Sequence, residues 1–374
     1  MDSSAVVTPP YVAGPLELRP FAALRLAPRR VGDPASARAF ARPYAAVPGR
    51  LAQWQERGHL TRDHEPALYL HEYTAGGITV RGLVGALDVS RRAGRPEDRA
   101  VLPHEGIHPT QADELADRME QMRLNPAPIL LVHRGSSELR DLLTRVQAEP
   151  AESEFTDRAQ QQHRVWAVRD PERLRAVATQ LRGARALIAD GHHRYGAYLR
   201  LQRRFPGTAH DRGLAMLVDQ DDTPLFLGAI HRTLAGSHFD DVRAAADAVG
   251  ARFRERAHLA AVDALAPDTL VVTDGRRWAS LQVTVDHSRL PVEVLHEDLV
   301  PALPRGPHRI GYHHSAEDAL AHASPQAGTA VLLPAPGVET VLRIVAADRL
   351  LPEKATSFQP KPSLGVLIRS LPDG

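Results

Sequence analysis

Short apolar runs alternate with amphipathic segments through the middle of the chain. Three strand patterns are each followed by a helical pattern, over residues 128–133, 136–149, 164–168, 171–181, 184–189 and 192–205. An apolar run of this length is typical of a buried strand, and an amphipathic segment buries one face against the resulting sheet. The alternation therefore predicts an α/β fold of the mixed α+β kind.

A hairpin and a helix are predicted before this stretch. Residues 68–73 and 78–89 are β-branched and apolar runs on either side of a turn that contains two glycines, which predicts a β-hairpin. Residues 110–124 have apolar side chains at helical spacing, with Thr110 and Asp113 placed as a capping box.

The last third of the chain has an alternation of its own. Helical and strand patterns occur there over residues 240–254, 270–273, 278–285, 292–300 and 337–349. A chain of 374 residues is also longer than one ordinary domain. We therefore predict two domains, residues 1–235 and residues 236–374.

The composition excludes several classes of partner and site. The formal net charge is +1 and aromatic residues make up 5% of the chain, so the sequence indicates neither a basic surface for nucleic acid nor a platform for stacking bases. Cysteine is absent, which excludes disulfides, thiolate metal sites and a cysteine nucleophile. No stretch reaches the roughly 20 apolar residues of a membrane span. With no signal peptide recognisable either, we expect a cytoplasmic protein without nucleic-acid or membrane partners.

The junction between the third strand and its helix carries the candidate chemistry. The apolar run 187–189 ends in Asp190-Gly191, and the helical pattern begins at His192. The first N–H groups of a helix have no partner within the helix, and the helix dipole adds partial positive charge at the same end. A strand that enters a helix through a glycine is therefore expected to bind an anion there, above all a phosphate.

The side chains of this turn suit a phosphate ligand. Gly191 lets the backbone approach the ligand, Arg194 can donate two parallel hydrogen bonds, and His192 and His193 add donors or an acid/base pair. Asp190 would repel an anion unless neutralised, so we expect it to hold Mg²⁺ on the phosphates or to orient a neighbouring histidine. A zinc site ranks lower, because adjacent histidines point in different directions. The chain contains neither a P-loop nor a Rossmann glycine motif.

Lysine is nearly absent from the chain. Among 46 basic side chains the only lysines are Lys354 and Lys361, and both lie in one short segment. An ammonium and a guanidinium bind anions with different geometry, which favours the hypothesis that a compact cation is required in that segment. The alternative interpretation is chance survival on a solvated loop.

The phosphate turn resembles a known superfamily. Residues 191–197 match the Gly-x-x-Arg-x-x-Ala phosphate box of the ParB/sulfiredoxin superfamily, and Asp190 to Arg194, Asp-Gly-His-His-Arg, resembles the free-serine kinase branch. From about Pro20 onwards the chain resembles the bacterial and archaeal family called domain of unknown function 1015. The resemblance implies a ParB/sulfiredoxin-like domain at 1–235, followed by a second α/β half.

Segments outside the turn carry the same resemblance. They are the opening segments Phe21–Arg25 and Arg42–Tyr44, the pair His104-Glu105 with Arg118, and the closing segment Pro352–Lys361. Ala45 and Ala355 depart from the pattern, which has Asp and Ser at these positions, so any part of those side chains is missing or supplied elsewhere. The closing segment contains both lysines. We expect it to fold back over the turn, so that one lysine meets a phosphate or a substrate carboxylate.

The kinase likeness implies phosphoryl transfer from a nucleotide, ATP or ADP, to a small hydroxyl substrate, with Mg²⁺. Glu105 is the expected base for the substrate hydroxyl, and Asp190 the expected metal ligand. The implied catalytic residues are Glu105, Asp190 and His193, and the implied nucleotide-binding residues are Gly191, His192, Arg194, Lys354 and Lys361. His71-Glu72 repeats the His-Glu dipeptide, but a strand sends adjacent side chains to opposite faces, so this pair is left out of the site.

Other functions are compatible with parts of the pattern. The first is a nucleotide-binding switch without turnover, because ParB-like domains use this box to hold a nucleotide that controls assembly. A DNA-binding adaptor would need a basic face or a helix-turn-helix, and the sequence indicates neither. A metal-dependent hydrolase would use Asp190, His192 and His193, with His313-His314, a pair more typical of a strand end at the surface. The sequence makes no prediction of oligomeric state.

Overall fold

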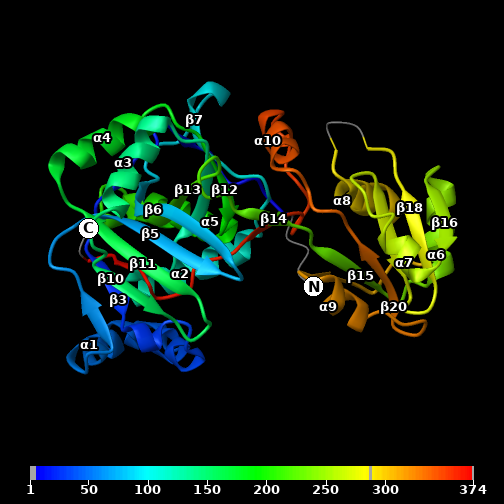
Figure 1. The fold of residues 1–374 in the computed structure, drawn as a ribbon, viewed down its shortest axis with the longest axis horizontal. Coiled ribbons are helices and arrows are strands. Elements are labelled where there is room, and N and C mark those ends of the chain that lie inside the picture. The colour runs from blue at the N-terminus through cyan, green and yellow to red at the C-terminus, as the bar shows by residue number, and fades with distance from the viewer. Residues whose placement is uncertain (1–5, 286–288, 373–374) are drawn as a thin grey trace. The chain divides into compact units, whose positions relative to one another are not determined.

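The computed structural model describes residues 6–285 and 289–372 and divides into two compact units (Figure 1). Unit 1 comprises Met1–Leu225 and Pro360–Gly374, and unit 2 comprises Phe226–Gln359. The end of the chain therefore belongs to the same unit as its beginning. The division at residue 235 stays a prediction about separately folding domains.

Unit 1 is built on a ten-stranded mixed sheet, with β2 paired to β6 beside the order β1-β7-β12-β9-β13-β6-β5-β11-β10. The strands are β1 (Val12–Ala13), β2 (Leu18–Arg19), β5 (Leu68–Ala75), β6 (Ile78–Asp88), β7 (Arg99–Leu102), β9 (Ile129–His133), β10 (Ser153–Thr156), β11 (Gln162–Val168), β12 (Ala186–Asp190) and β13 (Arg212–Asp219). The expected hairpin is β5–β6. Most of its residues are buried, as their apolar character predicts.

Helices cover this sheet. They are α2 (Pro109–Met122), α3 (Ser137–Gln147), α4 (Pro171–Leu181) and α5 (His192–Arg204), whereas α1 (Val47–Glu56) contacts β4 (Leu60–Arg62) and the 3-10 turns at 34–40 and 44–46. Further 3-10 turns lie at 28–30, 96–98 and 209–211. Apolar residues of α2, α3, α4 and α5 join those of the strands in one buried cluster. The predicted α/β fold is confirmed. No helix in the described parts of the chain is both long and apolar enough to cross a bilayer.

The predicted capping box of α2 is wrong. The helix begins at Pro109, one residue earlier than expected, and no side chain caps it. Proline is favoured at a first helical position because its φ is already helical and it has no N–H that needs a partner. Thr110 therefore lies inside the helix instead of before it.

A small sheet attaches the end of the chain to unit 1. Its order is β4-β3-β22-β8. These strands are β3 (Ala23–Leu26), β4 (Leu60–Arg62), β8 (Leu124–Asn125) and β22 (Ile368–Ser370). Arg369 on β22 is fully buried, and its guanidinium donates to the side chain of Asn125 and to the carbonyls of Arg212 and Ala209. These bonds fix the C-terminal strand in place.

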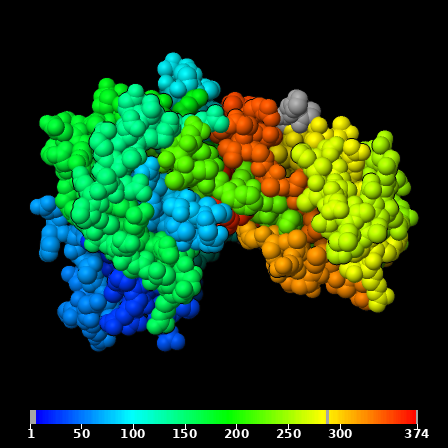
Figure 2. Space-filling model, in the orientation of Figure 1, coloured from blue at the N-terminus to red at the C-terminus, as the bar shows by residue number. Residues whose placement is uncertain are grey.

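Unit 2 contains a six-stranded antiparallel sheet of order β16-β18-β17-β20-β15-β19 and a separate strand pair, β14 with β21. The strands are β14 (Phe226–Gly228), β15 (His231–Ala235), β16 (Arg252–Arg256), β17 (Thr269–Thr273), β18 (Trp278–Gln282), β19 (Arg309–His313), β20 (Gly328–Leu332) and β21 (Ser357–Gln359). The helices are α6 (Phe239–Ala248), α7 (His258–Val262), α8 (Pro291–Val294) continued by the π-helix Leu295–Leu299, α9 (Ala316–Ala321) and α10 (Val338–Ala346). Unit 2 is drawn mainly in yellow and orange in Figure 2.

The helix predicted over 240–254 ends early. It stops at Ala248, and residues 252–256 form strand β16 instead. Gly250 follows the helix with a φ of +71°, a conformation that commonly ends a helix and that glycine adopts at little cost. The sequence contains this glycine, but the polar residues of 252–256 gave no strand pattern from which β16 could be predicted.

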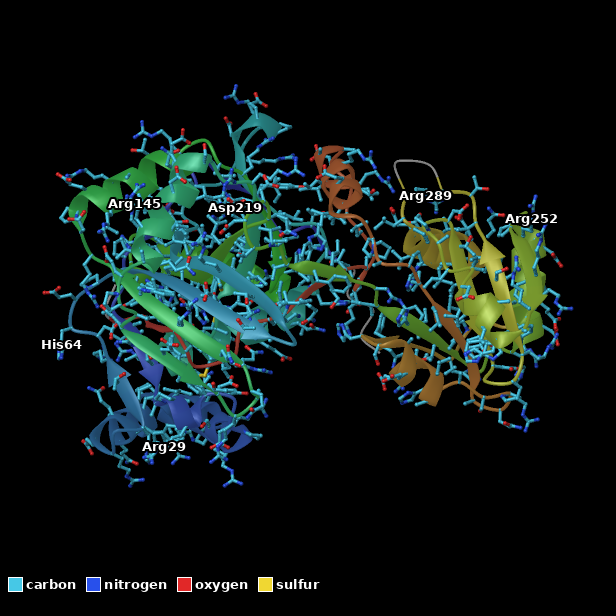
Figure 3. The ribbon with its side chains drawn as sticks, viewed as in Figure 1. Arg29, His64, Arg145, Asp219, Arg252 and Arg289 are labelled. Carbon is cyan, nitrogen blue, oxygen red and sulfur yellow. The ribbon has the colours of Figure 1, made fainter. Side chains whose placement is uncertain are left out.

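One carboxylate at a strand end has a structural role. Asp219, labelled in Figure 3, is the last residue of β13. It accepts hydrogen bonds from the N–H of Gly135, 3.1 Å away, and from the guanidinium of Arg140, 2.9 Å away. Strand β13 runs parallel to β9, and β9 runs antiparallel to β12. Asp219 therefore lies at the sheet edge opposite to the end of β12.

Candidate functional site

Two parallel strands end side by side at the candidate site. Strands β7 and β12 pair in parallel, with Leu102 opposite Leu187. Ligand sites in α/β sheets form at the carboxyl ends of such strands, because the loops that follow them leave the sheet at the same edge. The loop with His104-Glu105 follows β7, and the turn Asp190-Gly191 follows β12. Register thus brings together two segments that sequence alone suggested separately.

Gly191 is required by the local geometry. It precedes α5 with a φ of +94°, and no side chain caps the helix. A Cβ atom at this position would lie 2.9 Å from Nη2 of Arg194 and 3.0 Å from Cγ2 of Ile129. Glycine therefore provides both the left-handed backbone and the close approach of neighbouring groups.

Asp190 is held between two cations. One carboxylate oxygen accepts a hydrogen bond from Nη2 of Arg194, and the other accepts one from the ammonium of Lys361. The three side chains are partly exposed, and together they carry a net positive charge. The expected repulsion between Asp190 and an anion is thus offset by groups that this structure places on the carboxylate itself.

Lys361 is brought to the turn by the closing segment of the chain. The carbonyl of Pro360 accepts a hydrogen bond from the Tyr73 hydroxyl, 2.6 Å away, and the carbonyl of Lys361 accepts one from the Gln161 amide, 3.2 Å away. The hydroxyl of Ser363 donates to Asp157. Anchors at residues 360, 361 and 363 therefore hold the backbone around Lys361.

A buried chain of polar side chains supports these anchors. Asp157 lies 3.2 Å from Nε2 of His163, and Nδ1 of His163 lies 3.1 Å from Nε2 of His71. All three residues are buried. Burial, with a smaller effect of the neighbouring His163, lowers the pKa of His71 to about 3, so the imidazole is neutral at physiological pH. No sequence signal linked His71 to the β10–β11 hairpin that contains Asp157 and His163.

The dipeptide His71-Glu72 behaves as strand alternation predicted. His71 contacts His163, whereas Glu72 accepts hydrogen bonds from Arg164 and Gln147. The two side chains lie on opposite faces of β5. Neither contacts Asp190 through a bond that the structure records among its described residues.

His192 points inward and binds the loop after β7. Its Nε2 accepts a hydrogen bond from the backbone N–H of His104, 3.3 Å away, and the two rings meet edge to face with centroids 4.5 Å apart. Burial lowers the pKa of His192 well below its ordinary value, with smaller contributions from His104 and His193, and burial lowers the pKa of His104 to about 4. Both rings are therefore neutral. The predicted phosphate contact of His192 would have to come from Nδ1, because Nε2 accepts the bond from His104.

His193 joins α5 to the start of α2. Its Nε2 accepts a hydrogen bond from the backbone N–H of His108, 3.1 Å away, and the two rings stack with centroids 5.9 Å apart. Further along the same two helices, Arg200 pairs with Asp113 and Arg204 pairs with Asp117. The residue number increases in the same direction along both helices from one contact to the next, so α2 and α5 run parallel.

The parallel packing of α2 and α5 brings two helix N-termini to the same end of the unit. Neither helix has a side-chain cap. Each N-terminus carries about half a positive charge, so their fields add at this end. The sequence predicted the effect for α5 but missed the contribution of α2, because nothing in a single sequence indicates which helices pack in parallel.

Glu105 lies in the loop that His192 binds. Its side chain is mostly buried, and its Oε1 lies 3.7 Å from Nε2 of His104. The residue thus follows the strand next to β12 and is close in the fold to the start of α5. Its predicted role as a base stays a prediction.

Lys354 belongs to unit 2. Its ammonium lies 4.6 Å from the centroid of the Tyr312 ring, and its carbonyl accepts a hydrogen bond from Nη2 of Arg232, 2.9 Å away. Arg232 is fully buried and lies 4.6 Å from the same ring centroid. The two lysines of the closing segment therefore have different surroundings, and a nucleotide contact by Lys354 stays a prediction.

The opening segment and Arg118 meet at a second place in unit 1. The guanidinium groups of Arg42 and Arg118 lie 5.8 Å and 5.6 Å from the centroid of the Tyr44 ring. An open hollow of about 710 Å³ is lined there by Arg42, Pro43, Tyr44, Ala45, Glu114, Asp117, Arg118 and Gln121. Of these residues, Arg42, Pro43, Tyr44 and Arg118 are those that resemble the family pattern, and they gather beside α2.

The residues of the hydrolase alternative are divided between the two units. Asp190, His192 and His193 belong to unit 1, whereas His313 and His314 belong to unit 2. The ring of His192 binds a backbone amide, and Nδ1 of His314 lies 3.0 Å from the hydroxyl of Ser357. A joint metal site of these residues stays a prediction.

Three solved structures are similar to the chain at low sequence identity. A mutant free serine kinase in complex with ADP is 16% identical, with a TM-score of 0.39, and the match covers 71% of this chain and 89% of that chain. A conserved hypothetical protein from Pyrococcus furiosus is 15% identical, with a TM-score of 0.39 and coverage of 73% and 94%. SbnI with a C-terminal truncation, from Staphylococcus aureus, is 12% identical, with a TM-score of 0.42 and coverage of 72% and 83%. Likeness at this level assigns no activity to the chain.

The family of the chain is shown by its sequence. No curated protein matches it. A family model described as "Protein of unknown function (DUF1015)" matches residues 6–304, which include the loop at His104-Glu105 and the turn at Asp190. The match ends before the closing segment that carries the two lysines. The predicted resemblance is confirmed, and the chain belongs to the DUF1015 family.

Proposed function

We propose that this protein is a nucleotide-dependent phosphotransferase that acts on a small hydroxyl substrate. The observation that carries the proposal is the contact between Lys361 and Asp190 at the start of α5. It joins one of the two lysines of the chain to the turn that has the composition of a phosphate site. The closing segment returns to this turn and is anchored on both sides of Lys361. This arrangement supports a cationic site at the turn.

The charges of the site favour phosphate. Arg194 and Lys361 contribute two positive charges against the single negative charge of Asp190. The N-termini of α2 and α5 add partial positive charge at the same end of the unit. A charge-assisted hydrogen bond to a phosphate oxygen contributes about 1.5–3 kcal/mol. Two such bonds would help to position the terminal phosphates of ATP or ADP.

Asp190 is the proposed ligand for Mg²⁺. Phosphate oxygens that bind Arg194 and Lys361 compete with the carboxylate for these cations, which leaves a hard oxygen ligand beside the phosphates. Mg²⁺ on the phosphates would neutralise their charge during transfer. His193, which lies between the two helix N-termini, is proposed to contact the transferred group.

Glu105 is the proposed general base. It follows the strand parallel to β12, and the buried, neutral ring of His104 lies beside it. A carboxylate in this position would accept the proton of the substrate hydroxyl as the phosphoryl group is transferred. The acceptor is proposed to be a hydroxy-amino acid or a related small alcohol.

The experiment measures nucleotide turnover by the purified chain. ATP and Mg²⁺ are supplied with a panel of hydroxy-amino acids, and ADP formation is followed for the wild type and for Glu105→Gln. Turnover that depends on the acceptor and falls at least about 100-fold in Glu105→Gln, with ADP affinity kept, supports the proposal. Nucleotide binding without turnover would instead support the switch.

A matched pair of variants tests the position of the nucleotide. Arg194→Ala is expected to weaken ADP binding by about 1.5–3 kcal/mol. Arg203→Ala removes an exposed arginine from the last turn of the same helix and should leave the affinity unchanged. Equal affinities for the two variants would place the phosphates elsewhere.

A further inference from the structure

Three metal-ligating side chains converge at one end of unit 2. His313 is the last residue of β19, Asp318 lies in the first turn of α9, and His322 follows the last turn of that helix. Asp318 and His322 are four residues apart, which places them on the same face of the helix. One potential ligand atom from each of the three residues lies within 4.8 Å of the other two.

The carboxylate of Asp318 lies between two imidazoles. One oxygen is 2.6 Å from Nδ1 of His313, and the other is 3.7 Å from Nδ1 of His322. The side chain of His313 is 8% exposed, whereas those of Asp318 and His322 are each 55% exposed. One ligand atom is thus fixed by the fold, and the other two are carried by side chains that can adjust.

A supporting contact orients the buried imidazole. Nε2 of His313 lies 3.0 Å from the hydroxyl of Thr233 on the neighbouring strand β15. A Cβ atom at Gly311 would lie 2.2 Å from this hydroxyl and 3.0 Å from Nε2, so the glycine leaves space for the contact. A histidine that ligates through Nδ1 carries its proton on Nε2 and commonly donates it to such a partner.

We propose that His313, Asp318 and His322 bind one divalent transition-metal ion of the zinc class, with a further position open to water. Two imidazoles and one carboxylate are typical ligands of Zn²⁺, whereas Mg²⁺ and Ca²⁺ prefer oxygen ligands alone. Tetrahedral coordination at the usual bond lengths separates ligand atoms by about 3.3 Å. Nδ1 of His322 also lies 2.8 Å from the backbone carbonyl of Asp318, so this ring either ligates through Nε2 or gives up that bond, and the two exposed side chains would have to rotate to reach the tetrahedral spacing.

The site is independent of the proposed phosphotransferase activity. Its ligands all belong to unit 2, whereas Asp190, Arg194 and Lys361 belong to unit 1. Its location explains a feature that the sequence left open, namely the histidine pair at 313–314. Only the first histidine of that pair joins the cluster, because Nδ1 of His314 lies beside Ser357 instead.

The experiment uses the full chain, stripped of metal with a chelator and titrated with Zn²⁺. Calorimetry is expected to show one tight site, and X-ray absorption at the zinc edge is expected to show nitrogen and oxygen ligands that include two imidazoles. Asp318→Asn and His322→Gln are expected to weaken this site at least about tenfold, and Thr233→Val by about tenfold through loss of the supporting contact. His314→Gln is the matched control and should bind as the wild type does.

Two outcomes would overturn the proposal. One is the absence of a tight site in the wild type. The other is a site whose affinity is unchanged in Asp318→Asn and His322→Gln, because the chain has 19 histidines and other groups of them could bind zinc. If a variant fails to fold, as judged by circular dichroism, the absorption spectrum of the wild type decides, since a first shell without two imidazoles contradicts the assignment.

Discussion

Replacement of Lys361 by methionine tests the central contact of the candidate site. Methionine keeps an unbranched side chain of similar length and removes the ammonium that binds Asp190. The lysine side chain is 44% exposed, so its ion pair contributes no more than about 1 kcal/mol to stability. The melting temperature of Lys361→Met is therefore expected to stay close to that of the wild type.

The effect on nucleotide binding is expected to be larger than the effect on stability. A charge-assisted hydrogen bond to a phosphate contributes about 1.5–3 kcal/mol, which corresponds to an ADP dissociation constant about 10- to 150-fold higher in Lys361→Met. Titration calorimetry with ADP measures the constant directly. An unchanged constant in a folded variant would refute the assignment of Lys361 to the phosphates.

The second lysine provides the comparison. Lys354→Met removes an ammonium that lies over the ring of Tyr312 in unit 2. If Lys354 also binds the nucleotide, as the sequence predicted, this variant too should bind ADP at least about tenfold more weakly. A loss confined to Lys361→Met would show that, of the two lysines, Lys361 makes the phosphate contact.

Three further perturbations follow from the same contacts. Gly191→Ala is expected to lower the free energy of unfolding, measured in urea, by at least about 1–2 kcal/mol. The reason is that an alanine is strained at this positive φ and that its Cβ would crowd Arg194. An unchanged free energy of unfolding would contradict the geometry of the turn. Ser363→Ala removes the bond to Asp157 and is expected to weaken ADP binding several-fold by loosening the backbone around Lys361, while an unchanged affinity would show that the other anchors suffice. Burial lowers the pKa of His71 from 6.5 to about 3, so the unfolded chain binds a proton that the folded chain excludes. The contribution of His71 to the free energy of unfolding is therefore complete above pH 6.5 and is lost as the pH falls towards 3. Urea unfolding should show a loss of about 2 kcal/mol from this residue between pH 7 and pH 5, which His71→Gln abolishes; an equal loss in the variant would assign the effect to other groups.

The local parts of the fold could be predicted because their signals are local. A period of two or 3.6 residues marks a strand or a helix whatever lies around it, and α4 spans the residues that its pattern predicted. The order of strand, glycine and helix at Asp190-Gly191-His192 likewise sets the backbone geometry of the turn. The predictions of a capping box at α2 and of the end of α6 were wrong. Each depended on which of several neighbouring residues takes the first or the last position of the helix.

The residues brought to the turn were decided by pairings between distant segments. Lys361 reaches Asp190 because β22 pairs with β3 and β8. In addition, Tyr73, Gln161 and Asp157 anchor residues 360, 361 and 363, which precede β22. The parallel packing of α2 and α5, the inward position of His192 and the placement of Lys354 in unit 2 depend on such pairings as well.

The sequence alone determined the composition of the turn at Asp190-Gly191, the backbone conformation of that turn and the family of the chain. The tertiary structure decided which charges surround the turn and which histidines are neutral. The physical reason is that periodicity and turn chemistry act over a few residues, whereas burial and strand register depend on contacts between segments that a single sequence does not specify.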